Sequence, residues 1–361
     1  MTKAAAIVLP EKLPGRRVEE WKYSDLRTAL GDGGFGTGHA RASVGPLPQG
    51  VEFFDLDNLD RPEWVKAHYG KLASNSVSAV SMALAKGGVA LRMPKNRVAD
   101  QPLTLHFSGN GHVRALLVLE EGASLTLHEQ LIGDDTRNIG FEIVLGANAH
   151  LNHVRIAPSA DAAVQVEEVA ITLATHARYH AHNAAFGAKL SRLELDIALA
   201  GQGAQAHLTG VSVLSDNHAD VTTRMHHMVG NTQSTQLFKK VAAGKSRAIY
   251  QGKVSVAPHA DASDSRQTAK ALLLGARSEA DLKPELEILA DDVKCAHGAA
   301  VGELDADSLF YLRARGLLES EARNLLIHAF LEEAIPEMAR DLVQDQVNDA
   351  LAHISSLGAL A

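Results

Sequence analysis

The sequence has one cysteine, few aromatic residues and no long apolar run, and each scarcity excludes a class of protein. Cys295 is alone among 361 residues, so no internal disulfide can form and a reducing compartment is expected. No apolar stretch approaches the roughly 18 residues that a membrane span requires. Basic residues are too scattered to bind phosphates, and the formal net charge is -8. We therefore expect a soluble, cytoplasmic protein that binds neither nucleic acid nor membranes.

The dominant pattern is an alternation of apolar and polar residues with period two, from about residue 89 to residue 256. Segments such as LTLHF (103–107) and RLELDIAL (192–199) carry it, and no long helical pattern interrupts them. A weak repeat begins at Gly122, Gly146 and Gly203, with a degenerate copy at His176. Spacings of roughly 24 to 31 residues are typical of one coil of a parallel β-solenoid. A β-sandwich is the competing architecture, but the small, stackable side chains and few aromatic anchors favour the solenoid.

Helical patterns occupy both ends of the chain. Residues 16–30 have the spacing of an amphipathic helix that ends at Gly31, a Gly- and Pro-rich connector follows, and a second helical region spans residues 62–84. We therefore expect a mainly β protein in three parts. These are an N-terminal helical segment with its connector (1–88), a β-solenoid core (89–302) and a C-terminal helical domain (303–361).

The C-terminal part is expected to form three helices. The first stops at Gly316, the second starts from an N-cap at Ser320, and the third opens at Pro336. The apolar stripe of the second comprises Ala322, Leu325, Leu326, Ala329 and Phe330, and that of the third comprises Met338, Leu342, Val343, Val347 and Leu351. These helices either cap the end of the solenoid or form a docking surface.

The motif DVKCAHG places Cys295 and His297 two residues apart in a strand-like run. Period-two spacing puts both side chains on one face, where a thiolate and an imidazole suit iron, zinc or sulfur chemistry. Two ligands cannot complete a four-coordinate site, so a metal centre here would take the remainder from another chain. Spacing alone favours the simpler interpretation, a buried cysteine beside a hydrogen-bonded histidine.

Other motifs are weaker. The glycines of residues 31–36 lack the preceding strand and following helix of a dinucleotide site, and AAGKS at 242–246 lacks the earlier glycine of a phosphate loop. His176, His180 and His182, with His150 if its register cooperates, could form a metal ladder on one strand face. An exposed polar face is the simpler interpretation of these histidines.

Three segments resemble the SufB/SufD family of iron–sulfur cluster assembly proteins. They are RRVEEWKYSDL near the start, EILADDVKCAHGAAVG at 287–302, and FYLRARGL with ARNLLI at 310–327. SufB-like chains are longer and carry additional cysteines, so the lone Cys295 favours the SufD branch. The resemblance implies a right-handed parallel β-helix between helical ends.

The resemblance also implies partners. A non-catalytic scaffold subunit would pair with SufB through the β-helix and dock the SufC ATPase on its C-terminal helices, which would transmit ATP-driven motion. His297, with Cys295 close by, would face the SufB interface, where a transient iron–sulfur cluster is built, and the chain alone would hold no cofactor stably. The residues expected to contact SufC are Tyr311, Arg313, Arg315, Leu325, Leu326 and Phe330.

Two other functions are compatible with a solenoid. A carbohydrate-acting enzyme would need a cleft of paired carboxylates, for which Glu142, Glu194 and Asp196 are the candidates. A homo-oligomeric structural protein would pair through a solenoid end or edge, and the isolated chain could form a homodimer in the same way.

Overall fold

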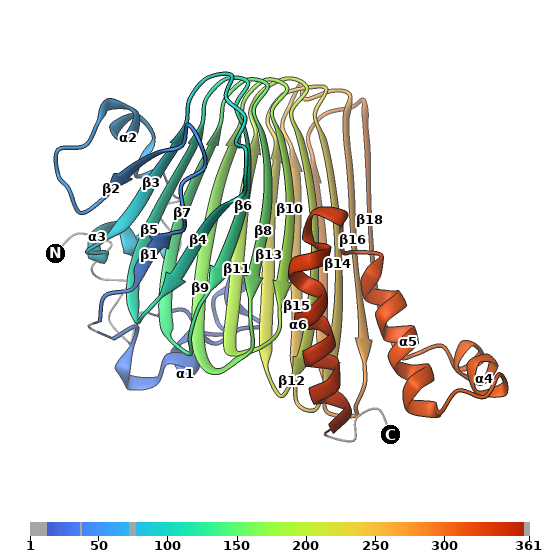
Figure 1. Ribbon diagram of the computed structural model, residues 1–361. Helices are drawn as coiled ribbons and strands as arrows, with labels where there is room; N and C mark the ends of the chain where they lie inside the picture. The colour runs from blue at the N-terminus through green and yellow to red at the C-terminus, as the bar shows by residue number, and fades with distance from the viewer. Residues whose placement is uncertain (1–12, 37, 72–76, 357–361) are drawn as a thin grey trace.

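The computed structural model describes residues 13–36, 38–71 and 77–356. Within them, the strands coil into a β-solenoid with two long sheets, and helices lie at both ends of the chain (Figure 1). Successive strands of the core alternate between the two sheets, and each pairs with the strand one coil further along. The predicted solenoid is therefore confirmed.

Sheet A contains, in spatial order, β1 (Arg41–Val44), β4 (Leu103–Ser108), β6 (Ser124–Leu131), β8 (His150–Ala157), β10 (Arg178–Ala185), β12 (Gln205–Ser215), β14 (Gln233–Ala243), β16 (Ser263–Leu273) and β18 (Val293–Gly302). Sheet B contains β2 (Glu52–Asp55), β3 (Gly88–Met93), β5 (Gly111–Leu119), β7 (Thr136–Leu145), β9 (Ala160–Leu173), β11 (Ala188–Leu199), β13 (His218–His227), β15 (Arg247–Val256) and β17 (Glu279–Ile288). The helices are η2 (Glu19–Trp21), α1 (Leu26–Leu30), η3 (Gly31–Gly33), α2 (Glu63–His68), η4 (Ser78–Val80), α3 (Ser81–Leu84), α4 (Ala306–Ala314), α5 (Glu319–Glu332) and α6 (Glu337–Ser356).

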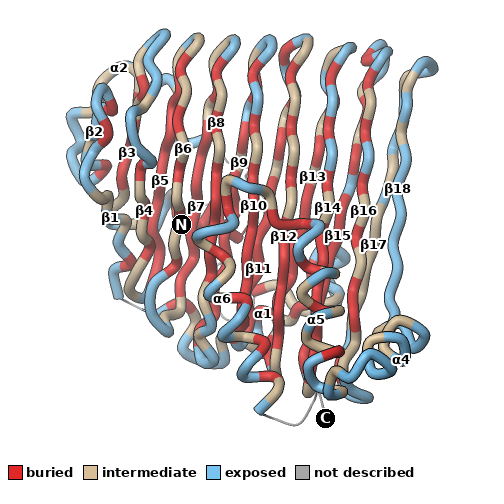
Figure 2. The backbone as a smooth tube through the Cα atoms, turned by 45° about the vertical axis from the view of Figure 1, so that its right-hand side comes forward, coloured by how far each residue is buried: buried red, intermediate tan, exposed pale blue. Residues whose placement is uncertain are grey.

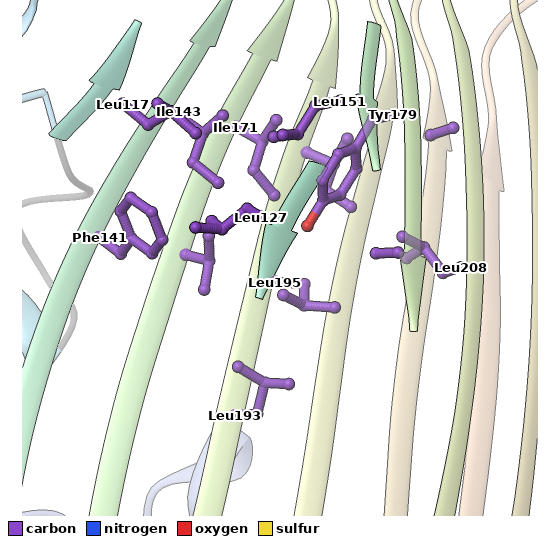
Figure 3. Packing of buried hydrophobic residues seen from close by; sticks show 14 of the residues in the cluster. Leu117, Leu127, Phe141, Ile143, Leu151, Ile171, Tyr179, Leu193, Leu195 and Leu208 are labelled. Atoms are coloured by element: carbon purple, nitrogen blue, oxygen red, sulfur yellow. The ribbon is translucent and has the colours of Figure 1, made fainter. Parts of the chain in front are cut away.

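Stacked rows of apolar side chains fill the interior of the solenoid (Figure 3). One row in sheet B runs from Leu117 through Ile143 and Ile171 to Ile197, each in register with the next. All four side chains are buried. Because each coil has apolar neighbours on both sides, stacking removes from water the faces that a single coil would expose.

The turn that leads into each strand of sheet A carries the repeat. Gly122, Asn148, His176 and Gly203 all have positive φ, between 56° and 74°. Ser124 pairs with His150, so Asn148 is the counterpart of Gly122. The repeat predicted to begin at Gly146 was therefore two residues out of phase, because the left-handed turn position accepts asparagine or histidine as well as glycine.

The N-terminal part differs from the prediction. Residues 16–30 form two short helices, η2 and α1, because the outer face of sheet B holds them: the Arg192 guanidinium lies 4.1 Å from the Trp21 ring centre, and Ser24 Oγ donates to Asp220 Oδ2 at 2.6 Å. The connector also supplies β1 and β2, which pair antiparallel with β4 and β3 at the first coils. Of the predicted helical region 62–84, residues 72–76 lie outside the described residues.

Helix α6 lies along the outer face of sheet A, so it does not cap the end of the solenoid (Figure 1). Its buried residues are Ala339, Val343, Val347, Leu351 and Ile354. Met338 and Leu342, which the predicted stripe included, are partly buried against the same cluster. None of the described helices combines the length and apolar character needed to cross a membrane.

Helix α5 turns only part of the predicted stripe inward, namely Ala322 and Phe330. It buries Ala322, Ile327 and Leu331, whereas Leu325 and Ala329 are exposed. The helix begins two residues before the predicted start, because the Glu321 side chain accepts a hydrogen bond from the Leu318 backbone N–H.

The last coil of the solenoid is open. Strands β17 and β18 are the final members of sheets B and A, and no described strand pairs with their outer edges. Figure 2 shows β18 as largely exposed, in contrast to the mostly buried strands β10 and β12 of the same sheet. Its backbone and its inward face are therefore accessible to another molecule.

Candidate functional site

Cys295 and His297 lie on β18, at this open end. The register pairs Cys295 with Ser265 and His297 with Gln267 of β16. Both β16 residues are buried inward-facing positions, so the alternation of the strand places Cys295 and His297 on the same, inward side. Cys295 is partly buried against the interior cluster and His297 is exposed. The structure thus brings the predicted pair together on one face, next to an edge that a partner can reach.

Burial raises the pKa of the Cys295 thiol, and the nearby Asp264 carboxylate acts in the same direction. A hydrogen bond with the Ser265 backbone opposes both effects. Since the ordinary pKa of the thiol is already above neutrality, Cys295 is a protonated thiol at neutral pH. A metal ion or a cationic partner group would be needed to stabilise the thiolate.

No group of three or more His, Cys, Asp or Glu side chains within the described ranges is arranged to hold a metal ion. The histidine ladder differs from the predicted set: His150, His180 and His207 stack on sheet A with ring centres 5.0 and 4.9 Å apart. His182 is buried and pairs with Thr209, and His176 lies in a turn. Burial and the neighbouring histidines lower the pKa of His180 to about 4.

Helices α4 and α5 form a hairpin that extends beyond the solenoid (Figure 1). Helix α4 has no buried residue. A groove of about 530 Å³ runs between the two helices. Its lining is mostly apolar and comprises Asp307, Ser308, Tyr311, Leu312, Leu325, Leu326 and Ala329. Tyr311 and Leu325 are 57% and 50% exposed, so the groove presents apolar side chains to the solvent.

The six residues predicted to contact an ATPase fall into three places. Tyr311, Leu325 and Leu326 line the groove, and the Arg315 guanidinium lies 5.1 Å from the Tyr311 ring centre. Arg313 faces a second pocket on the hairpin and pairs with Glu319 at 3.1 Å.

Phe330 lies apart from the groove. It packs against the sheet A cluster, with Lys239 Nζ 4.4 Å from its ring centre. Lys239 also pairs with Glu333, so Phe330 belongs to the contact that joins α5 to β14.

The candidate carboxylates of a carbohydrate-acting enzyme are engaged in the fold. Glu142 is buried and pairs with Arg114. Glu194 and Asp196 both pair with Arg224, at 3.0 and 3.1 Å. A glycosidase needs one carboxyl group free to donate a proton and another free to attack, and these arginine pairs oppose both roles.

Residues 107–330 match the family model described as the SUF system FeS cluster assembly, SufBD core domain. The chain belongs to the SufB/SufD family. This match spans most of the solenoid and the α4–α5 hairpin, and it includes both Cys295 and His297.

Curated relatives of this SufB/SufD-family chain come from bacteria and plants. The iron-sulfur cluster assembly protein SufD of Escherichia coli (strain K12) is 34% identical over 241 residues, 65% of this chain and 57% of the relative. The SufBD family protein slr0076 of Synechocystis is 32% identical over 256 residues, 66% and 56% of the two chains. Protein ABCI7, chloroplastic, of Arabidopsis thaliana is 27% identical over 341 residues, 87% and 71%. The match thus spans little more than half the length of the first two relatives.

Proposed function

We propose that this chain is a non-catalytic scaffold subunit for cytoplasmic iron–sulfur cluster assembly, in the SufD position of a complex with SufB and SufC. The observation that carries the proposal is the placement of Cys295 and His297 on the open last coil. Family membership supports a role in cluster assembly. No strand in the described part of the chain pairs with the outer edges of β17 and β18, which supports a partner that continues the two sheets.

In this proposal the iron–sulfur cluster is cargo, and it forms between two subunits. Cys295 supplies a soft thiolate and His297 an imidazole, and iron–sulfur centres accept both kinds of ligand. The SufB subunit supplies the remaining ligands, because two side chains fill only half of a four-coordinate iron. A site divided between two chains holds its cluster only while they are joined, which suits a cluster that must be passed on.

The α4–α5 hairpin is the proposed docking site of the SufC ATPase. Its apolar groove is exposed, and α5 is joined to β14 through Phe330, Lys239 and Glu333. Motion of the ATPase would therefore reach sheet A through this contact.

Co-expression with SufB and SufC from the same genome tests the proposed complex. Wild-type chain should purify with both partners, and Leu325→Asp should lose only SufC, because Leu325 is half exposed and its replacement leaves the fold intact. Leu59→Asp is the matched control, since Leu59 is 86% exposed and lies near the other end of the solenoid. Retention of SufC by Leu325→Asp would place the docking site elsewhere, and purification as a homodimer alone would contradict the SufB pairing.

A further inference from the structure

A row of polar side chains leads through the interior of the solenoid to His297. Gln236 of β14 is in register with Gln267 of β16, and Gln267 is in register with His297 of β18. The two glutamines are almost fully buried, at 2% and 1% exposure. Most of the interior is apolar, so buried amides beneath the candidate site need a hydrogen-bonding reason.

Tyr250 fixes the orientation of the Gln267 amide. The Tyr250 hydroxyl donates its one hydrogen to Gln236 Oε1 at 3.1 Å, and Thr223 Oγ donates to the same oxygen at 2.7 Å. The Tyr250 oxygen must then act as acceptor, and Gln267 Nε2 donates to it at 2.9 Å. Burial raises the pKa of Tyr250, which keeps this hydroxyl protonated. The Gln267 nitrogen therefore faces the tyrosine, and its oxygen faces elsewhere.

Gln267 Oε1 is a buried acceptor with no hydrogen-bond partner among the described residues. The site is shaped for the amide: a methyl group on Gly252 would lie 1.8 Å from Gln267 Nε2. The other unpaired amide atom in the row is Gln236 Nε2, which lies on the opposite side of Gln267 from His297. An unpaired buried carbonyl oxygen costs about 1–3 kcal/mol, so a donor is expected beside it.

We propose that Gln267 is a positioning residue: its Oε1, unpaired in the structure, accepts a hydrogen bond from one ring nitrogen of His297 when the exposed imidazole turns toward it. The bond holds that nitrogen as N–H and leaves the other nitrogen with a free lone pair for iron. Hydrogen bonds of this kind orient metal-binding histidines and select their tautomer. The consequence for cluster assembly rests on the proposed function, whereas the hydrogen bond itself does not.

The test is the ring-nitrogen NMR spectrum of the isolated, full-length chain labelled with ¹⁵N-histidine. The His297→Ala variant identifies the His297 signals among those of the 18 histidines. We expect one tautomer of His297 in the wild type and a mixture of two in Gln267→Leu. Gln267→Glu keeps an acceptor and should restore the single tautomer. Gln165→Leu, which replaces a buried glutamine of β9 outside this network, should leave the spectrum of His297 unchanged.

Unchanged His297 signals in Gln267→Leu, or the same mixture in Gln165→Leu, would overturn the proposal. Should Gln267→Leu fail to fold, Gly252→Ala displaces the same amide, and it must also produce the mixture. Cluster yield with SufB and SufC separates the two proposals. About tenfold lower yield in Gln267→Leu is expected from the effect of such supporting residues on metal sites. Altered tautomers with normal yield would refute the ligand role of His297 and leave the hydrogen bond standing.

Discussion

Proline substitutions on β18 test whether its open edge pairs with a partner strand. In sheet A, Arg178 N–H donates to Ala149 at 2.8 Å and Asp264 N–H donates to Thr232 at 3.0 Å, each toward the preceding coil. Lys294 occupies the same register position in β18, opposite Asp264. Because donors alternate along a parallel strand, the even-numbered residues of β18 donate to β16 and the odd-numbered ones face the open edge.

Ala299→Pro removes one donor from the open edge and leaves the ladder to β16 intact, so the isolated chain should unfold at nearly the wild-type temperature. A partner strand loses a hydrogen bond worth about 0.5–1.5 kcal/mol and is crowded by the proline ring. We therefore expect SufB to bind about tenfold more weakly or worse, since 1.4 kcal/mol corresponds to a factor of ten.

Ala300→Pro is the matched control, one residue along the same strand. It removes a donor to β16 and leaves a backbone acceptor of that strand unpaired, at a cost of about 1–3 kcal/mol. Thermal unfolding of each isolated variant and the affinity of each for SufB are the two measurements. Wild-type affinity in Ala299→Pro would refute pairing at this edge, and equal destabilisation by both prolines would refute the inferred direction of the N–H groups.

The remaining predictions concern the stability of the fold. Burial lowers the pKa of His112 to about 4 and of His182 to about 3, whereas a histidine in the unfolded chain has a pKa near 6.5. Below pH 6.5 the unfolded chain therefore binds protons that the folded chain does not. The free energy of unfolding should fall by up to about 1.4 kcal/mol per histidine for each pH unit below 6.5. Equal urea midpoints at pH 7 and pH 5 would contradict this. Arg192→Ala leaves the Asp220 carboxylate buried without its arginine, so the free energy of unfolding in urea should fall by about 3–5 kcal/mol. A loss below about 1 kcal/mol would contradict the stabilising role of this ion pair. Ile171→Ala opens a cavity in a stacked interior row, so the free energy of unfolding in the same assay should fall by about 2–5 kcal/mol. A smaller loss would show that the coils close around the cavity.

The core of the fold was predictable because period-two alternation reports directly which side chains face the interior. The same alternation is enough to predict that Cys295 and His297 share one face of their strand. The residue at which each repeat begins was harder to predict. Glycine occupies the left-handed turn position at Gly122 and Gly203, but Asn148 and His176 occupy it in the other two coils.

The ends of the chain were harder to predict, because tertiary contacts override weak local patterns there. Strand β1 has only four residues and forms by pairing with β4, which lies far along the chain. Helix α5 carries apolar residues on more than one face, so its pattern did not reveal that Ile327 faces the solenoid and Leu325 faces outward. Nothing in the sequence indicated a role for Gln267. Its position beside His297 follows only from the strand register, which pairs the two residues.

The iron and sulfide content of complexes reconstituted from this chain with SufB and SufC tests the proposed function most sharply. His297→Ala should leave the complex intact and abolish cluster formation, because in the proposed function the imidazole is one of the ligands that this chain supplies. His259→Ala, which changes a turn residue on the same solenoid, should assemble clusters as the wild type does. Wild-type iron and sulfide in an intact His297→Ala complex would contradict the claim that a cluster forms between the open last coil and a second subunit.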